Sequence, residues 1–228
     1  MARELEAYAY SVAHDVRTPL RAIDGFSAMV LDDDGPRLSA ASVEHLERAR
    51  EAAQRMGRLL DDLLGLSRVS RYELHRSRVD LSAQVAEVAA EVATDYPGRS
   101  VEQSIHPGMT ADADPTLTRM IVRELLANAW KFTGLRETAH IEVGVDDSGA
   151  TPVFFVRDDG AGFDMRAAAH LFGVFQRMHP SDQFPGHGIG LATVQRLVLR
   201  QGGRVWAEAE VDKGATISFT LPAPTAVG

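Results

Sequence analysis

The chain has 228 residues and a formal net charge of −8, with 45% hydrophobic and 25% charged residues. This length suits two small globular domains, the absence of cysteine excludes disulfides and thiolate metal sites, and an acidic chain without a basic block is not expected to bind nucleic acid. No apolar run approaches the ~20 residues that cross a bilayer, so we expect no membrane segment and a cytoplasmic location.

Residues 1–71 are predicted to form a hairpin of two helices. Apolar residues recur at intervals of three and four in both halves: Leu5, Val12, Val16, Leu20, Ile23 and Val30, then Val43, Leu46, Ala49, Ala53, Met56, Leu60 and Leu63. Gly35 and Pro36 break the pattern, and Ser39 or Ser42 could cap the second helix. Because two helices alone leave one apolar face exposed, we expect pairing with a second copy into a dimeric four-helix bundle.

The remaining chain is predicted to be a polar linker, an α+β domain and a short tail, over residues 72–80, 81–223 and 224–228. Helical periodicity appears over 81–96, 115–131, 166–175 and 189–200, and strand patterns over 141–145, 153–156, 204–208 and 216–221. This mixture favours an α+β sandwich with helices on one face of a sheet.

Two glycine clusters stand out in this second part. The first, Asp158-Asp159-Gly160-Ala161-Gly162, follows an apolar strand, and the second, Gly186-His187-Gly188-Ile189-Gly190-Leu191, opens a helix. Glycine allows close backbone approach to a ligand, and a helix N-terminus attracts phosphate. Each cluster alone is equally compatible with a tight turn that binds nothing.

A third group of polar residues lies on the helix over 115–131. Glu124, Asn128 and Lys131 are spaced by four and three and therefore share one helix face. A carboxylate, an amide and an amine on one face match the needs of a magnesium–phosphate group. In isolation, the same spacing also fits a solvated helix face.

His14 is the candidate nucleophile of the first helix. At 100° per residue it points away from the stripe formed by Val12, Val16 and Leu20, which argues against a packing role. Pro19 cannot donate to the preceding turn, so a bend is expected nearby. The adjacent Asp15 carboxylate could hold one ring nitrogen protonated and leave the other free to attack phosphorus. Before its context is considered, a solvated surface histidine is the more ordinary interpretation.

The order of these motifs resembles the histidine kinases. ELLANAWKF, DDGAGF, LFGVFQRMH, GHGIGLA and KGATISFTLP are similar to the N, G1, F, G2 and G3 boxes of their ATPase domain, whose fold is shared with gyrase, Hsp90 and MutL. SVAHDVRTPL resembles the H box of the HisKA dimerisation and phosphoacceptor domain, and RAIDGFS is similar to its phytochrome-linked or PAS-linked branch. No P-loop motif occurs.

The resemblance implies ATP and Mg²⁺ as cofactors. By likeness to the family, Asn128 and Glu124 would hold Mg²⁺, Lys131 would reach a phosphate, and Asp158 would accept a hydrogen bond from the adenine amino group. The remaining nucleotide contacts implied are Gly160, Gly162, Phe175, Gly186, Gly188, Gly190, Leu191 and Thr216. Phe172 and Phe175 would pack at the base of a lid over about 176–187, in which Arg177 either stabilises the transferring γ-phosphoryl group or is merely solvated.

The resemblance also assigns roles in phosphotransfer. His14 would be the phosphoacceptor, Asp15 its assisting base, and Thr18 would position water for dephosphorylation. The phosphoryl group would pass to an aspartate of a response regulator, and a sensory domain would precede the chain.

Two residues depart from the family pattern. Many histidine kinases have Asn at the position of Glu124, whereas gyrase-like ATPases use Glu there to orient water; His187 stands where many relatives have Thr. Glu124 keeps a gyrase-like ATPase open as an alternative. A non-catalytic dimer scaffold and a phosphatase-dominant member, which His14, Asp15 and Thr18 would permit, are two further alternatives.

Overall fold

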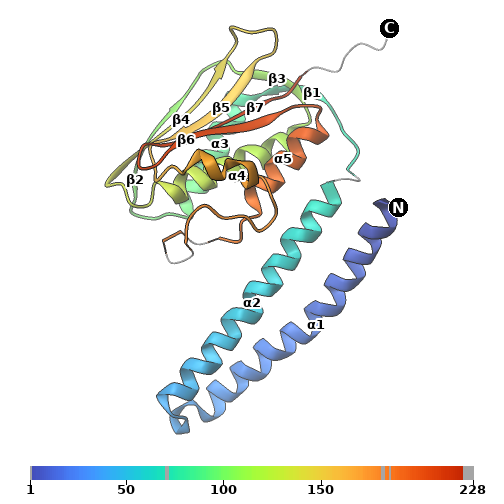
Figure 1. The fold of residues 1–228 in the computed structure, drawn as a ribbon, viewed down its shortest axis with the longest axis vertical. Coiled ribbons are helices and arrows are strands. Elements are labelled where there is room, and N and C mark those ends of the chain that lie inside the picture. The colour runs from blue at the N-terminus through green and yellow to red at the C-terminus, as the bar shows by residue number, and fades with distance from the viewer. Residues whose placement is uncertain (1, 70–71, 181–182, 185, 223–228) are drawn as a thin grey trace. The chain divides into compact units, whose positions relative to one another are not determined.

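The structure, a computed structural model, describes residues 2–69, 72–180, 183–184 and 186–222, without the side chains of 2–14, 61–64 and 66–69. The chain divides into two compact units, residues 1–71 and 72–228 (Figure 1). The predicted tail over 224–228 lies outside the described residues.

The first unit is a helical hairpin of α1 (Ala2–Asp34) and α2 (Ala40–Val69), joined by the 3₁₀ turn η1 (Gly35–Arg37). Of the two predicted caps, Ser39 is the one used: its Oγ accepts a hydrogen bond from the Ser42 N–H at 3.1 Å. Asp24 of α1 accepts from Arg50 Nε at 3.1 Å and from Gln54 Nε2 at 3.0 Å of α2, which fixes how the helices pair.

The apolar stripe of the hairpin is only partly covered within one chain. Leu20 and Ala53 are buried between the helices. Large apolar side chains beside them remain exposed, with Phe26 68% accessible; the others are Ile23, Met29, Val30 and Met56. The hairpin thus retains an apolar face, as its periodicity predicted.

The second unit is built on a mixed five-stranded sheet, within the part of the chain that is described. Its strand order is β2 (Ser100–Ile105), β4 (Thr138–Asp146), β5 (Val153–Asp158), β7 (Gly214–Thr220) and β6 (Val205–Glu210). β2 runs parallel to β4 and the other neighbours are antiparallel. A separate ribbon pairs β1 (Ser77–Asp80) with β3 (Thr110–Ala113).

Helices α3 (Leu81–Thr94), α4 (Pro115–Phe132) and α5 (Gly190–Arg200) cover one face of the sheet (Figure 1). The core between the two layers consists of fully buried apolar side chains, among them Val85, Val88, Ile121, Leu125, Leu197 and Phe219. The α+β sandwich that the sequence predicted is therefore the observed architecture.

The structure differs from the sequence-based expectations at several elements. The four residues of β1 lie in the segment predicted to be a linker, and β2 and β3 were not predicted. A helix expected over 166–175 is the 3₁₀ segment η2 (Met165–His170) instead. β2 escaped detection because it is an edge strand whose exposed pattern lacks the period of two.

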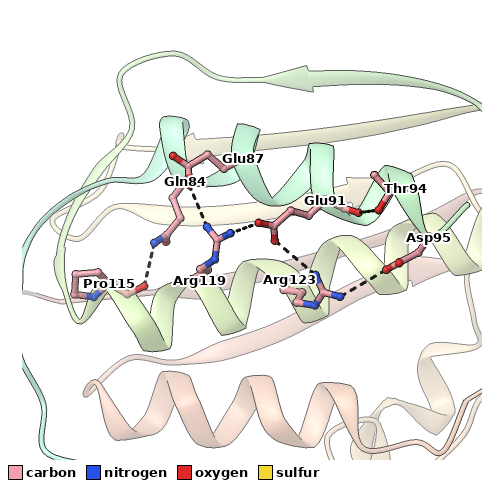
Figure 2. A network of polar contacts seen from close by, with 8 residues as sticks. All are labelled: Gln84, Glu87, Glu91, Thr94, Asp95, Pro115, Arg119 and Arg123. Atoms are coloured by element: carbon pink, nitrogen blue, oxygen red, sulfur yellow. Dashed lines mark hydrogen bonds and ion pairs between the residues drawn. The ribbon is translucent and has the colours of Figure 1, made fainter.

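Ion pairs connect α4 with α3 and the residue after it along their exposed sides (Figure 2). Arg119 contacts Glu87 at 3.1 Å and also Glu91, and Arg123 contacts Glu91 at 3.7 Å and Asp95 at 3.6 Å. Exposed pairs stabilise weakly, by ~1 kcal/mol or less each.

No helix among the described residues combines the length and apolarity needed to cross a membrane.

Candidate active site

A different side of α4 from that of the ion pairs carries the three predicted polar residues. Glu124, Asn128 and Lys131 are all half-buried there, and Lys131 Nζ donates to Asn128 Oδ1 at 3.0 Å. Burial lowers the pKa of the Lys131 ammonium, the Arg177 guanidinium lowers it further, and the Glu124 carboxylate opposes both. The spacing by four and three therefore produces the shared face that the sequence predicted.

The second glycine cluster packs directly on this face. A Cβ atom added at Gly190 would lie 2.7 Å from Glu124 Oε2 and 3.5 Å from Asn128 Nδ2. One added at Gly186 would lie 3.3 Å from Lys131 Nζ. Residues about 60 positions apart in the sequence thus meet where the N-terminus of α5 offers free N–H groups, an arrangement suited to phosphate.

Gly188 is required by its backbone. Its φ is +70°, and a Cβ atom there would lie 2.4 Å from the carbonyl oxygen of Gln176. The half-buried Leu191 follows within the first turn of α5. Only glycine permits this close approach of the cluster to the segment after η2.

Asp158, the last residue of β5, forms a second polar centre. Its Oδ1 accepts the Gly160 N–H at 2.9 Å, and its carboxylate also accepts the backbone N–H of Ala215. Burial nevertheless raises the pKa of Asp158 from 3.8 to about 6, with the two hydrogen bonds opposing the shift and nearby Asp159 adding to it. A buried acceptor of this kind suits an amino or amide donor.

The glycines after Asp158 are packed against the backbone of neighbouring segments. A Cβ atom at Gly160 would lie 2.6 Å from the Phe132 carbonyl oxygen, and one at Gly162 1.9 Å from that of Glu210. Gly162 also has a φ of +56°. The Asp158–Gly162 turn is therefore held between the end of α4 and the end of β6.

The predicted lid segment is described in part, since residues 181, 182 and 185 are not. Within it Arg177 donates to the carbonyl oxygens of Gly186 at 2.6 Å and Phe184 at 2.7 Å. Phe175 is 52% exposed with a φ of +64°, which is a strained conformation for a bulky residue. Phe172 is half-buried beside it in the sequence.

An aromatic cluster that the sequence did not predict holds the lid against α4. Phe132 lies 5.2 Å from Phe184 and 5.4 Å from His179, ring centre to ring centre, and the latter two are 5.1 Å apart. Lys131 Nζ sits 4.3 Å from the centre of the Phe132 ring. No sequence period links these residues, because two of them lie in a loop.

Thr216 is not brought to this site. On β7 it pairs with Arg157, whose Nε donates to its hydroxyl at 3.2 Å on the face of the sheet away from the helices. A shallow groove on that face includes His140 and Glu142, which already have charged partners: His140 lies 3.1 Å from Glu102 and Glu142 lies 2.9 Å from Arg157.

The predicted phosphoacceptor lies in the other unit. His14 is part of α1, but its side chain is outside the described residues. Asp15 and Thr18 are exposed on the same helix.

The donors on α4 fit a magnesium ion in kind. Asn128 offers an amide oxygen and Glu124 a carboxylate, which are the hard oxygen ligands that Mg²⁺ prefers. Among the described residues no group of three or more His, Cys, Asp or Glu side chains could hold a metal alone. Phosphate oxygens and water would have to complete the shell.

Comparisons with known proteins match this arrangement. Residues 4–71 match the His Kinase A (phospho-acceptor) domain, and residues 113–225 match the histidine kinase-, DNA gyrase B-, and HSP90-like ATPase. The chain is 34% identical over 97% of its length to the methanogenesis regulatory histidine kinase FilI of Methanothrix harundinacea, and 31% identical over 96% to cyanobacterial phytochrome B of Nostoc. It spans only 25% and 29% of those proteins.

A solved structure extends the likeness to both units. Full-length ShkA in complex with AMPPNP is 27% identical, with a TM-score of 0.67 over 97% of this chain and 47% of that one. With the two domains in this order and the motif residues gathered on α4, α5 and β5, the chain belongs to the sensor histidine kinases, as their catalytic core.

Proposed function

We propose that the chain transfers the γ-phosphoryl group of ATP to its own His14. The observation that carries this proposal is the meeting of Glu124, Asn128 and Lys131 with Gly186 and Gly190 at the start of α5. This geometry offers oxygen ligands, an ammonium and free N–H groups to one triphosphate. Asp158, in its separate buried turn, supplies an acceptor for the adenine amino group.

Lys131 and Asn128 can both turn to a nucleotide at this site. Lys131 Nζ, which now donates to Asn128 Oδ1, has further N–H groups for a phosphate oxygen, and Asn128 Oδ1 has a second lone pair for the metal. Burial and the Arg177 guanidinium disfavour the Lys131 ammonium and lower its pKa, so a bound phosphate anion would stabilise the charged form of Lys131. Bound Mg²⁺ would neutralise charge on the β- and γ-phosphate oxygens.

The phosphotransfer step then involves one bond formed and one broken. The free imidazole nitrogen of His14 attacks the γ-phosphorus as the bond to the β,γ-bridging oxygen breaks and ADP leaves. Asp15 keeps the other ring nitrogen protonated. Arg177, which now donates to two lid carbonyls, could turn to the transferring group once the lid rearranges.

The wider assignment follows the same proposal. Residues 1–71 would form the dimerisation and phosphotransfer domain, 72–80 the connection and 81–223 the ATP-binding domain, in a cytoplasmic homodimer. The exposed apolar face around Phe26 supports pairing of two hairpins. The phosphoryl group would pass to an aspartate of a response regulator in a phosphorelay, Thr18 would assist its removal, and a sensory domain would precede the chain.

Incubation with γ-labelled ATP and Mg²⁺ tests the proposal. Wild type and the matched histidine control His45→Ala, exposed on α2, should both acquire acid-labile, alkali-stable label. His14→Ala and Asn128→Ala should acquire none. Label that persists in His14→Ala would refute the assignment of the phosphoacceptor.

A gyrase-like ATPase is the second candidate, favoured by the carboxylate of Glu124 close to Gly190. It predicts phosphate release that survives His14→Ala and disappears in Glu124→Gln. Phosphate release without any phosphoprotein would move the chain to that class.

A further inference from the structure

Arg136 is an exposed arginine that none of the sequence motifs includes, yet it binds three backbone carbonyls. It lies just after α4, where its own N–H donates to the Thr133 carbonyl oxygen at 2.9 Å. Its Nε donates to the Asp159 carbonyl at 2.7 Å, and Nη2 donates to those of Gly160 at 3.3 Å and Asp212 at 2.6 Å. The planar guanidinium can serve several acceptors at fixed angles, which a lysine cannot.

These carbonyls belong to the two loops that frame Asp158. Asp159 and Gly160 directly follow Asp158, and the Gly160 N–H is one of its two hydrogen-bond donors. The second loop is tied to the same turn, since the Asp212 N–H donates to the Ala161 carbonyl at 2.8 Å. Arg136 therefore joins the β5 turn to the β6–β7 turn from outside.

The other donor to Asp158 also depends on the second loop. Ala215 follows Gly214, whose φ is +102° and whose added Cβ atom would lie 1.9 Å from the Asp158 carbonyl oxygen. If the two loops separate, Asp158 loses its alignment with both donors. The carboxylate of Asp158 would then no longer be held in one orientation, and its remaining lone pairs would not point consistently toward a bound base.

We propose that Arg136 is a positioning residue for the purine base, which holds the turn so that Asp158 faces the adenine amino group. This inference rests on the proposed function, because it assumes that Asp158 accepts from adenine. Through Asp158, Arg136 would act on recognition of the 6-amino group of the purine. It should therefore affect the affinity for adenine nucleotides and the preference for adenine over guanine. It does not touch the phosphates or the reacting atoms.

Arg76 offers a matched control elsewhere in the same unit. Its guanidinium likewise donates to three carbonyls, those of Asp112 at 2.8 Å, Pro222 at 3.1 Å and Gln201, at the C-terminal end of α5. Arg76→Gln thus removes a comparable clamp without touching the nucleotide turn. A difference between the two variants isolates the base-positioning role from the loss of structural bonds.

The experiment is isothermal titration of the full chain with Mg-ADP and Mg-GDP, followed by autophosphorylation at varied ATP. Arg136→Gln should weaken ADP binding about tenfold or more and reduce the ratio of ADP affinity to GDP affinity. In autophosphorylation it should raise the KM for ATP and leave kcat nearly unchanged. Arg136→Lys should recover little of this, and Arg76→Gln should bind ADP as wild type does.

Each outcome decides one question. Wild-type protein that binds no ADP would overturn the proposed function itself. Wild type that binds ADP, with Arg136→Gln binding equally well or with both arginine variants weakened alike, would overturn the positioning role and leave the function intact.

Discussion

The buried carboxylate of Asp158 gives the ATP-binding unit a distinctive dependence of stability on pH. Its pKa is about 6 in the folded protein and 3.8 in the absence of burial. Between these values the folded state holds the proton that the unfolded state has released, so the free energy of unfolding falls as pH rises. The difference between the two pKa values corresponds to about 3 kcal/mol in the free energy of unfolding. Roughly 2 kcal/mol of this stability is lost when the pH rises from 4.5 to 8.

Asp158→Asn removes this dependence. The asparagine side chain of the variant keeps an oxygen that can accept from the Gly160 N–H, but its amide nitrogen cannot accept from the Ala215 N–H. Losing this second hydrogen bond lowers the stability of the variant by an amount that does not vary with pH. The stability of the variant relative to wild type should therefore rise by roughly 2 kcal/mol from pH 4.5 to pH 8, while ADP binding is lost.

Urea unfolding at the two pH values measures the effect, followed by tryptophan fluorescence. Both tryptophans, Trp130 and Trp206, lie in the second unit, so the signal reports that unit alone. Asp147→Asn, exposed in the loop after β4, is the control and should show no such change. A relative stability of Asp158→Asn that is the same at both pH values would refute the reasoning.

Further predictions concern the hairpin and the glycine turn. Phe26→Glu should convert the proposed dimer to a monomer in sedimentation equilibrium, because it places a charge on the exposed apolar face of α1. Leu135→Glu, at a similarly exposed position in the other unit, should leave the oligomeric state unchanged, and a dimeric Phe26→Glu would count against that interface. Gly162→Ala should lower the free energy of unfolding in urea by about 3 kcal/mol or more, because the new Cβ atom would collide with a backbone carbonyl. Gly98→Ala, which also has a positive φ but has open space around it, should lower it by only about 1 kcal/mol. Equal losses in the two variants would show that backbone strain alone matters. Ser39→Ala should lower the stability of the hairpin by about 1 kcal/mol in thermal unfolding followed by circular dichroism, and an unchanged midpoint would deny the cap.

Local sequence patterns predicted several helices and one shared face of polar residues in this protein. The helices α3, α4 and α5 begin and end within two residues of their predicted bounds, because apolar periodicity and capping chemistry are local. The shared face of Glu124, Asn128 and Lys131 likewise follows from helix geometry alone. The glycine clusters pointed to close backbone approach before any neighbour was known.

Tertiary structure decided what local signals do not encode. Whether Gly190 meets Glu124, and whether Arg136 reaches carbonyls 23 to 76 residues away, depends on how the sheet orders its strands. Thr216 shows the same limit in reverse: it stands in a recognisable motif, yet strand alternation turns its hydroxyl to Arg157 on the other face. Motif residues can thus be named from the sequence, whereas the contacts that orient them arise only when distant segments pack together.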